Sequence, residues 1–99
     1  MSEITLGIIG GGQLGSMLAI AAKKLNVKTV VFCDDMNAPA QNFCNQFING
    51  SYDDKDKISE FINQVDLVTY EFENIPFETL NEINKFKPVL PKPSVNRLI

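Results

Sequence analysis

Some segments of this chain are short apolar runs, and others carry apolar residues at spacings of three and four. The alternation of these two patterns predicts short strands separated by helices. The predicted strands share a short apolar run beside turn residues, and they comprise residues 4–9, 27–33, 46–49, 67–70 and 89–90. Strands that alternate with helices are typical of a parallel, doubly wound α/β sheet, here of about five strands. Right-handed crossovers then place all strand carboxyl ends along one edge, where ligands bind.

The helices expected between these strands carry apolar residues at spacings of three and four. The stripe expected to face the core in the first helix comprises Leu14, Met17, Leu18, Ala21, Ala22 and Leu25. The corresponding stripes of the next two helices comprise Ile58, Phe61, Ile62 and Val65, and then Phe77, Leu80 and Ile83. Asp53 or Asp54 is suited to cap the second helix, and Pro76 to begin the third. Ala38-Pro39-Ala40 predicts a further short helix, with Phe43 turned inward.

Three glycines separate the first predicted strand from the first helix. Gly10, Gly12 and Gly15 satisfy the pattern G-x-G-x-x-G. The first permits a tight turn, the second lets a ligand approach the backbone, and the third lets helix and strand pack closely. Free N–H groups and the positive end of the helix dipole then favour a phosphate. A bare tight turn is the alternative, and the pattern does not say which phosphate-bearing molecule binds.

Composition narrows the range of functions. The 99 residues predict one domain, 1–99, with a net charge of −3 and no dense basic stretch, so nucleic acid is not an expected partner. No apolar run approaches a membrane span, and the predicted strand at the N-terminus leaves no room for a signal peptide, so we expect a cytoplasmic protein. Cys33 and Cys44 lack metal-site spacing and are expected to be reduced, structural thiols. The absence of histidine excludes Ser-His-Asp and Cys-His catalysis.

Two carboxylates follow the fourth predicted strand directly. Glu71 and Glu73 belong to the loop 71–74, at the edge where ligands are expected. A carboxylate at a strand end can accept hydrogen bonds from ribose hydroxyls. General acid–base chemistry or a metal site is an alternative for the pair, although no neighbouring Asp, His or Lys completes one. Glu73 can instead cap the helix that begins at Pro76.

Other polar residues near the glycines admit two interpretations each. Gln13 can donate a hydrogen bond to a ligand, or it can solvate the start of the helix. Asp34 follows Gly15 by 19 residues, close to the position of the acidic residue that holds a ribose hydroxyl in a dinucleotide site. Asp34 and Asp35 are equally suited to a solvated turn. An NAD(P)-binding domain of an oxidoreductase therefore remains an alternative.

Two of these segments, taken together with their spacing, resemble one known family. The segment 9–15 with Met17-Leu18-Ala19 resembles the opening of the 5-(carboxyamino)imidazole ribonucleotide synthases (phosphoribosylaminoimidazole carboxylase ATPase subunits), members of the ATP-grasp superfamily. The segment 68–76, Val-Thr-Tyr-Glu-Phe-Glu-Asn-Ile-Pro, is close to a signature of that family. Residues 38–40, 52–54 and 91–99 are also similar to segments of that family, more weakly, and they occur in the same order along the chain as in the family.

The resemblance implies a Rossmann-like, pre-ATP-grasp domain that helps to bind 5-aminoimidazole ribonucleotide rather than NAD. Gly12, Gln13 and Leu14 would contact the 5′-phosphate, and Glu71 would hold the ribose hydroxyls. The weaker candidates for substrate binding are Gly10, Gly15, Asp34, Asp35, Glu73 and Asn74. Of these, Glu73 and Asn74 would support the loop that contains Glu71. Ser16 departs from the arginine that many relatives have, and Cys33 from an acidic residue. Arg97 receives no role.

The reaction that the resemblance implies is a ligation in purine biosynthesis. ATP phosphorylates bicarbonate to carboxyphosphate, and the exocyclic amine of the ribonucleotide is then carboxylated, leaving ADP and phosphate. ATP and Mg²⁺ would be bound by an ATP-grasp domain beyond residue 99, so no catalytic residue, metal ligand or cofactor is expected in this chain. The sequence after Ser94 predicts a helix of about one turn, from which we expect a fragment of a longer protein, inactive alone. That protein is expected to be a homodimer. A regulatory nucleotide-binding module is a third, non-enzymatic alternative.

Overall fold

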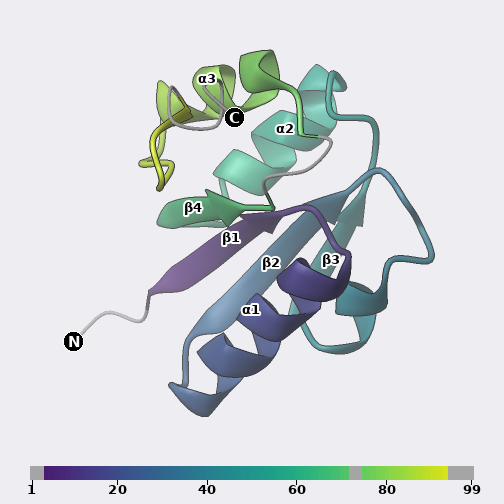
Figure 1. Ribbon diagram of the computed structural model, residues 1–99. Coiled ribbons are helices and arrows are strands. Elements are labelled where there is room, and N and C mark those ends of the chain that lie inside the picture. Colours follow the sequence, from purple (N-terminus) through teal and green to yellow (C-terminus); the bar gives the residue numbers. More distant parts are fainter. Residues whose placement is uncertain (1–3, 72–74, 94–99) are drawn as a thin grey trace.

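A parallel four-stranded sheet forms the centre of the computed structural model, which describes residues 4–71 and 75–93 (Figure 1). Its strands are β1 (Thr5–Ile9), β2 (Lys28–Cys33), β3 (Gln46–Asn49) and β4 (Leu67–Tyr70). They lie in the order β3-β2-β1-β4, and all three pairings are parallel. The predicted α/β class and doubly wound arrangement are therefore confirmed. β1 is central and β4 lies beside it, so the segments that follow these two strands meet at one edge.

Successive residues of each strand point to opposite faces, and each face is covered by different helices. Ile9, Phe32 and Val68 belong to one buried cluster together with side chains of α2 (Lys55–Ile62) and α3 (Phe77–Asn84). Ile8 and Val31 belong to a second cluster, with Ala19 of α1 (Gln13–Lys24) and two alanines of the η1 region. Figure 1 shows α1 on one side of the sheet and α2 on the other. The near-continuous apolar character of the strands follows from this coverage of both faces.

The buried face of α1 differs from the predicted stripe. Its buried residues are Gly15, Ser16, Ala19 and Ala22, whereas Leu14, Met17 and Leu25 are 42%, 58% and 76% exposed. A Cβ atom on Gly15 would overlap the carbonyl oxygen of Gly10, so the helix lies too close to the backbone below it for large side chains. Small residues therefore form the contact, and the larger apolar residues are left facing outward. The predicted end of the helix at Asn26 is confirmed, since this residue follows the C-cap Leu25 and has φ of 59°.

The fifth predicted strand is not a strand in the structure. Val89 forms a single parallel bridge with Val68. In this bridge the Val68 N–H donates to the Pro88 carbonyl at 2.8 Å, and the Leu90 N–H donates to the Val68 carbonyl at 2.9 Å. Proline has no N–H to donate, and prolines flank Val89 and Leu90 at positions 88 and 91. The pairing is therefore limited to one bridge, and the sheet has four strands.

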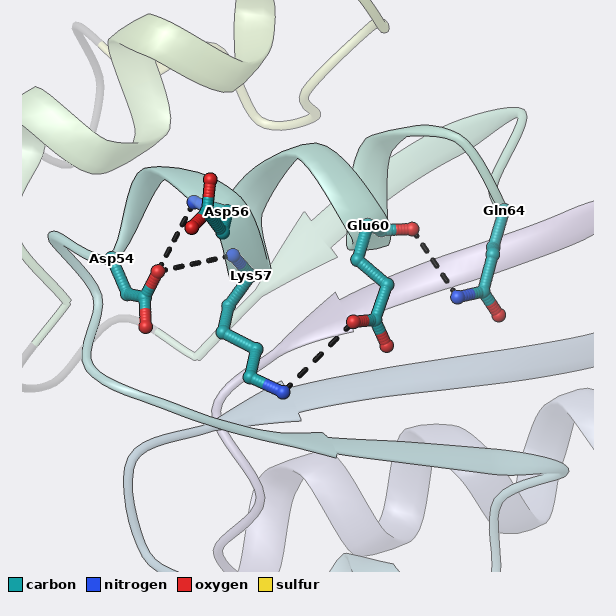
Figure 2. A network of polar contacts seen from close by, with 5 residues as sticks. All are labelled: Asp54, Asp56, Lys57, Glu60 and Gln64. Atoms are coloured by element: carbon teal, nitrogen blue, oxygen red, sulfur yellow. Dashed lines mark hydrogen bonds and ion pairs between the residues drawn. The ribbon is translucent and has the colours of Figure 1, made fainter.

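The second helix begins as the sequence predicts. The Asp54 carboxylate accepts hydrogen bonds from the Asp56 and Lys57 N–H groups at 3.0 and 3.2 Å, which satisfies two donors of the first turn (Figure 2). Further along, Lys57 and Glu60 form an exposed ion pair with an N–O distance of 3.9 Å. The predicted stripe of α2 is confirmed for Ile58, Phe61 and Ile62, which are buried, whereas Val65 is buried but follows the end of the helix. Helix α3 has Pro76 as its N-cap and buries Leu80 and Ile83.

A short 3-10 helix, η1 (Pro39–Asn42), lies beside α1. Ala38 and Ala40 are buried there, while Phe43 is 43% exposed, so the inward orientation expected for Phe43 is wrong. The alanines are small enough to approach the glycine loop, and they fill the inward positions of this segment instead. None of the helices in the described part of the chain is both long and apolar enough to cross a membrane. The helix expected after Ser94 lies outside the described residues.

Candidate functional site: a glycine loop facing a carboxylate

The glycine loop joins the central strand to α1 at the carboxyl edge of the sheet. Gly10 has φ of +101°, a conformation that side chains disfavour, and its N–H donates to the Phe32 carbonyl at 2.8 Å. Gly12 is the N-cap of α1, and its carbonyl accepts the Ser16 N–H at 2.9 Å. The N–H groups of Gln13 and Leu14 belong to the first helical turn, in which the helix itself offers no acceptor. The loop thus directs backbone donors and the positive end of the dipole toward the edge.

The carboxylate of Glu71 lies directly against this loop. Its Oε1 accepts the Gly15 N–H at 2.7 Å, a charge-assisted bond at the N-terminus of α1. The Glu71 N–H donates to the Ile9 carbonyl at 3.0 Å, which ties the end of β4 to β1. The two residues of the hydrogen bond are 56 positions apart in sequence. The side chain is half-buried, and its carboxylate retains acceptor capacity beyond the bond to Gly15.

All three glycines of the motif are closely approached by this one carboxylate. A Cβ atom would lie 2.7 Å from Glu71 Oε2 if placed on Gly10, and 3.2 and 3.1 Å from Oε1 if placed on Gly12 and Gly15. The space that the glycines leave open is thus shared with a side chain of the protein itself. The sequence placed the glycines and Glu71 at the same edge, but it gave no sign that they are in contact.

The η1 region supports the glycine loop from its other side. The Ala40 N–H donates to the Gly11 carbonyl at 2.9 Å. A Cβ atom on Gly11 would lie 2.7 Å from the Ala38 Cβ and 3.2 Å from the Cys33 Cβ. A side chain therefore does not fit at Gly11 without a shift of its neighbours. These supporting residues were not among the predicted site residues. The signal in the sequence was the small-residue segment 38–40, which was interpreted as a helix start and as a weak similarity to the family, without a role at the site.

Below Gly11, Cys33 takes part in a buried polar contact. The Tyr52 hydroxyl donates to the Cys33 Sγ over 3.7 Å, and the Thr79 hydroxyl donates to the Tyr52 carbonyl at 2.7 Å. Burial, reinforced by the hydrogen bond to Cys33, raises the pKa of Tyr52 well above its ordinary value of 10.0. Tyr52 therefore stays protonated and serves as a donor. Cys33 and Cys44 are both free cysteines, as expected, and Cys33 lies between the glycine loop and the core.

The other predicted site residues do not take part in the hydrogen bond between Glu71 and Gly15. Gln13 is exposed at the start of α1, where its amide is available to a ligand. Asp35 serves a turn, since its carboxylate accepts the Asn37 N–H at 2.9 Å, and Asp34 is exposed at the end of β2. Glu73, Asn74 and Arg97 lie outside the described residues. Within residues 4–71 and 75–93, no group of three Asp, Glu or Cys side chains could hold a metal ion.

This arrangement offers groups that can bind a ligand. It combines backbone donors of a helix N-terminus with one acceptor-only carboxylate, which suits a ligand that carries both an anionic group and hydroxyl groups. The geometry is therefore that of a ligand-holding edge.

Comparison with known proteins connects this edge to one family. The profile of the ribonucleotide synthetase preATP-grasp domain matches residues 3–99. N5-carboxyaminoimidazole ribonucleotide synthase of Staphylococcus epidermidis is 43% identical over 81 residues, covering 82% of this chain and 22% of its own. The bifunctional purine synthesis protein purC/E of Dictyostelium discoideum is 41% identical over 93 residues, covering 94% of this chain and 9% of its own.

Solved structures agree with these sequence matches. An N5-carboxyaminoimidazole ribonucleotide synthetase in complex with ADP superposes with a TM-score of 0.88 at 37% identity, over 98% of this chain and 27% of that one. The Aspergillus clavatus synthase in complex with ADP and 5-aminoimidazole ribonucleotide superposes with a TM-score of 0.81 at 29% identity. The match covers 96% of this chain and 26% of that one. The present chain spans about a quarter or less of the length of these relatives. The predicted family is thereby confirmed, and the chain belongs to the ribonucleotide synthetase preATP-grasp domain family.

Proposed function

We propose that residues 1–99 are the ribonucleotide-binding domain of an ATP-dependent ligase that carboxylates 5-aminoimidazole ribonucleotide in purine biosynthesis. The observation that carries the proposal is the contact of the Glu71 carboxylate with the N-terminus of α1, at 2.7 Å from the Gly15 nitrogen. This contact brings an acceptor for ribose hydroxyls beside donors for a phosphate. Support also comes from the relative whose complex contains 5-aminoimidazole ribonucleotide and ADP.

Each group of the ligand has a complementary group at this edge. The N–H groups of Gly12, Gln13 and Leu14 and the dipole of α1 would hold the 5′-phosphate, with the Gln13 amide as a further donor. The Glu71 carboxylate would accept hydrogen bonds from the ribose hydroxyls through the acceptor sites that Gly15 leaves free. Glu73 and Asn74 would support the loop, and Asp34 stays a weaker candidate. Asp35 is a poor candidate, because its carboxylate serves a turn.

The remaining substrates belong to other parts of the proposed enzyme. Among the described residues, no group of three Asp, Glu or Cys side chains could hold a metal ion. We assign ATP, Mg²⁺ and bicarbonate to polypeptide outside these 99 residues, in keeping with relatives whose structures contain ADP. A cytoplasmic location, in accord with the free thiols of Cys33 and Cys44, and a homodimer are further parts of the proposal.

The NAD(P)-binding alternative is disfavoured by the same carboxylate. In a dinucleotide site the pyrophosphate lies at the N-terminus of the helix after the glycine loop. Here Glu71 holds the Gly15 N–H, and two unit charges of the same sign about 4 Å apart repel by about 4 kcal/mol near a protein surface. A repulsion of that size offsets roughly two backbone hydrogen bonds to a charged group, which contribute about 1.5–3 kcal/mol each.

A thermal-shift titration tests the proposal. The protein is melted with increasing 5-aminoimidazole ribonucleotide and, in parallel, with NAD⁺. A ligand at 100 times its Kd stabilises the folded state by about 2.7 kcal/mol, which raises the Tm of a domain of this size by roughly 10–20 °C. We expect this shift with the ribonucleotide, its loss in Glu71→Ala, and its retention in Glu60→Gln, a matched change on the exposed face of α2. A shift with NAD⁺ but not with the ribonucleotide would refute the proposal.

A further inference from the structure

We propose that Glu71 determines which phosphorylated ligands this edge accepts: its carboxylate reserves the glycine loop for a monophosphate that carries hydroxyl groups and excludes diphosphates. The inference deepens the proposed function and rests on it for the identity of the preferred ligand. It assigns Glu71 a selective role in addition to the hydrogen bonds that it would make with a ribose.

The first argument is that Glu71 occupies part of the anion-binding surface. Its Oε1 is 2.7 Å from the Gly15 nitrogen and takes one of the free N–H groups of the first helical turn. Gln13 and Leu14 precede it in the same turn, and their N–H groups remain for a ligand. A single phosphate on the Gln13 and Leu14 N–H groups would lie farther from the carboxylate than a second phosphate that continued toward Gly15. The like-charge repulsion would therefore be smaller for a monophosphate than for a diphosphate.

The second argument is that the glycines leave no spare room around the carboxylate. The positions that Cβ atoms would take on Gly10, Gly12 and Gly15 lie 2.7–3.2 Å from Glu71 oxygens. In a dinucleotide site these positions are left open so that the pyrophosphate can approach the backbone. In this protein the carboxylate fills that space. The Glu71 main chain is held beside β1, because its N–H donates to the Ile9 carbonyl oxygen at 3.0 Å.

The third argument concerns the chemistry of the group itself. An ionised carboxylate only accepts hydrogen bonds, so it attracts hydroxyl groups and repels phosphate oxygens. A glutamine of nearly the same shape carries no charge and can donate from its amide nitrogen to a phosphate oxygen. The substitution Glu71→Gln is therefore expected to reverse the preference, not merely to weaken all binding.

Calorimetric titration of the protein with two probes tests this selectivity. The probes are D-ribose 5-phosphate, a monophosphate with free hydroxyls, and inorganic pyrophosphate, at equal ionic strength because exposed charges are screened by salt. For the wild-type protein we expect ribose 5-phosphate to bind at least about 10-fold more tightly than pyrophosphate, given the repulsion between like charges. Equal or tighter binding of pyrophosphate by the wild-type protein overturns the proposal without any variant.

The variants supply the decisive comparison. In Glu71→Gln we expect pyrophosphate to bind about 10- to 100-fold more tightly than in the wild-type protein and ribose 5-phosphate less tightly. Glu71→Ala, which removes the charge without adding a donor, is expected to show a smaller gain for pyrophosphate. Glu60→Gln removes the same charge on α2 and is expected to leave both affinities unchanged. Unchanged pyrophosphate binding in both Glu71 variants, with folding verified by circular dichroism, overturns the proposal.

The same titrations separate this inference from the proposed function. If Glu71→Gln gains pyrophosphate while the wild-type protein fails to bind 5-aminoimidazole ribonucleotide, the selective role stands and the proposed substrate is wrong. If the ribonucleotide binds to the wild-type protein and Glu71→Gln loses it without gaining pyrophosphate, the proposed function stands and the selective role is refuted.

Discussion

Replacing Gly15 with alanine tests how closely α1 lies on the glycine loop. The added Cβ would overlap the Gly10 carbonyl oxygen and lie 3.1 Å from Glu71 Oε1. Neither the backbone carbonyl nor a carboxylate that is hydrogen-bonded to Gly15 can move aside by a simple rotamer change. The helix must therefore shift away from the sheet, which loosens the packing of Ala19 and Ala22.

Two opposing effects set the magnitude of this change. Overpacking in a close contact costs typically 1–3 kcal/mol, and a contact with backbone is expected near the upper value, about 3 kcal/mol. Alanine in a helix interior is favoured over glycine by about 1 kcal/mol. The free energy of unfolding of Gly15→Ala should therefore fall by about 2 kcal/mol, and the Tm by roughly 8–16 °C for a domain of this size.

Urea unfolding followed by circular dichroism at the helix band measures this difference. Gly50→Ala is the comparison variant, because its Cβ would lie 2.8 Å from Cγ and 3.2 Å from Cβ of Lys57, so it meets a side chain where Gly15→Ala meets a backbone carbonyl. We expect the comparison variant to lose less stability than Gly15→Ala, at most about 1 kcal/mol, the lower end of the range for overpacking. A Gly15→Ala protein as stable as the wild type would show that propensity outweighs the contact, and it would refute the close packing derived above.

Two further substitutions test the local interactions around α2 and below the glycine loop. Asp54→Ala removes the acceptor of the Asp56 and Lys57 N–H groups, so the free energy of unfolding should fall by about 1 kcal/mol, whereas Asp54→Asn should retain most of it in the same urea assay. Burial raises the pKa of Tyr52, so above pH 10 the unfolded state ionises while the folded state stays protonated, and stability present below pH 10 is lost as the pH rises. Between pH 9 and 11 the wild-type protein should therefore lose about 1 kcal/mol more than Tyr52→Phe, and identical pH profiles would contradict a buried, protonated Tyr52.

Local sequence signals predicted most of the secondary structure correctly. Residues 28–33 and 67–70 are strands because their apolar, β-branched and aromatic side chains suit a sheet that is covered on both faces. Asp54 caps α2 because a short carboxylate at this position satisfies N–H groups only two and three residues away. Prolines on both sides of Val89 and Leu90 reduced the fifth predicted strand to one bridge, whereas the prediction took Pro91 only as the end of that strand.

The sequence by itself determined the order of elements, the α/β class and the glycine loop at the start of α1, because these depend on periodicity and on residues a few positions apart. Only the tertiary structure decided which face of α1 is buried, since close approach to the sheet selected Gly15 and Ala19 over the more hydrophobic Leu14 and Met17. Only the tertiary structure joined Glu71 to Gly15, because that hydrogen bond spans 56 positions and forms when β4 pairs with β1. Periodicity describes one element at a time, and contacts between distant elements depend on how closely their backbones approach.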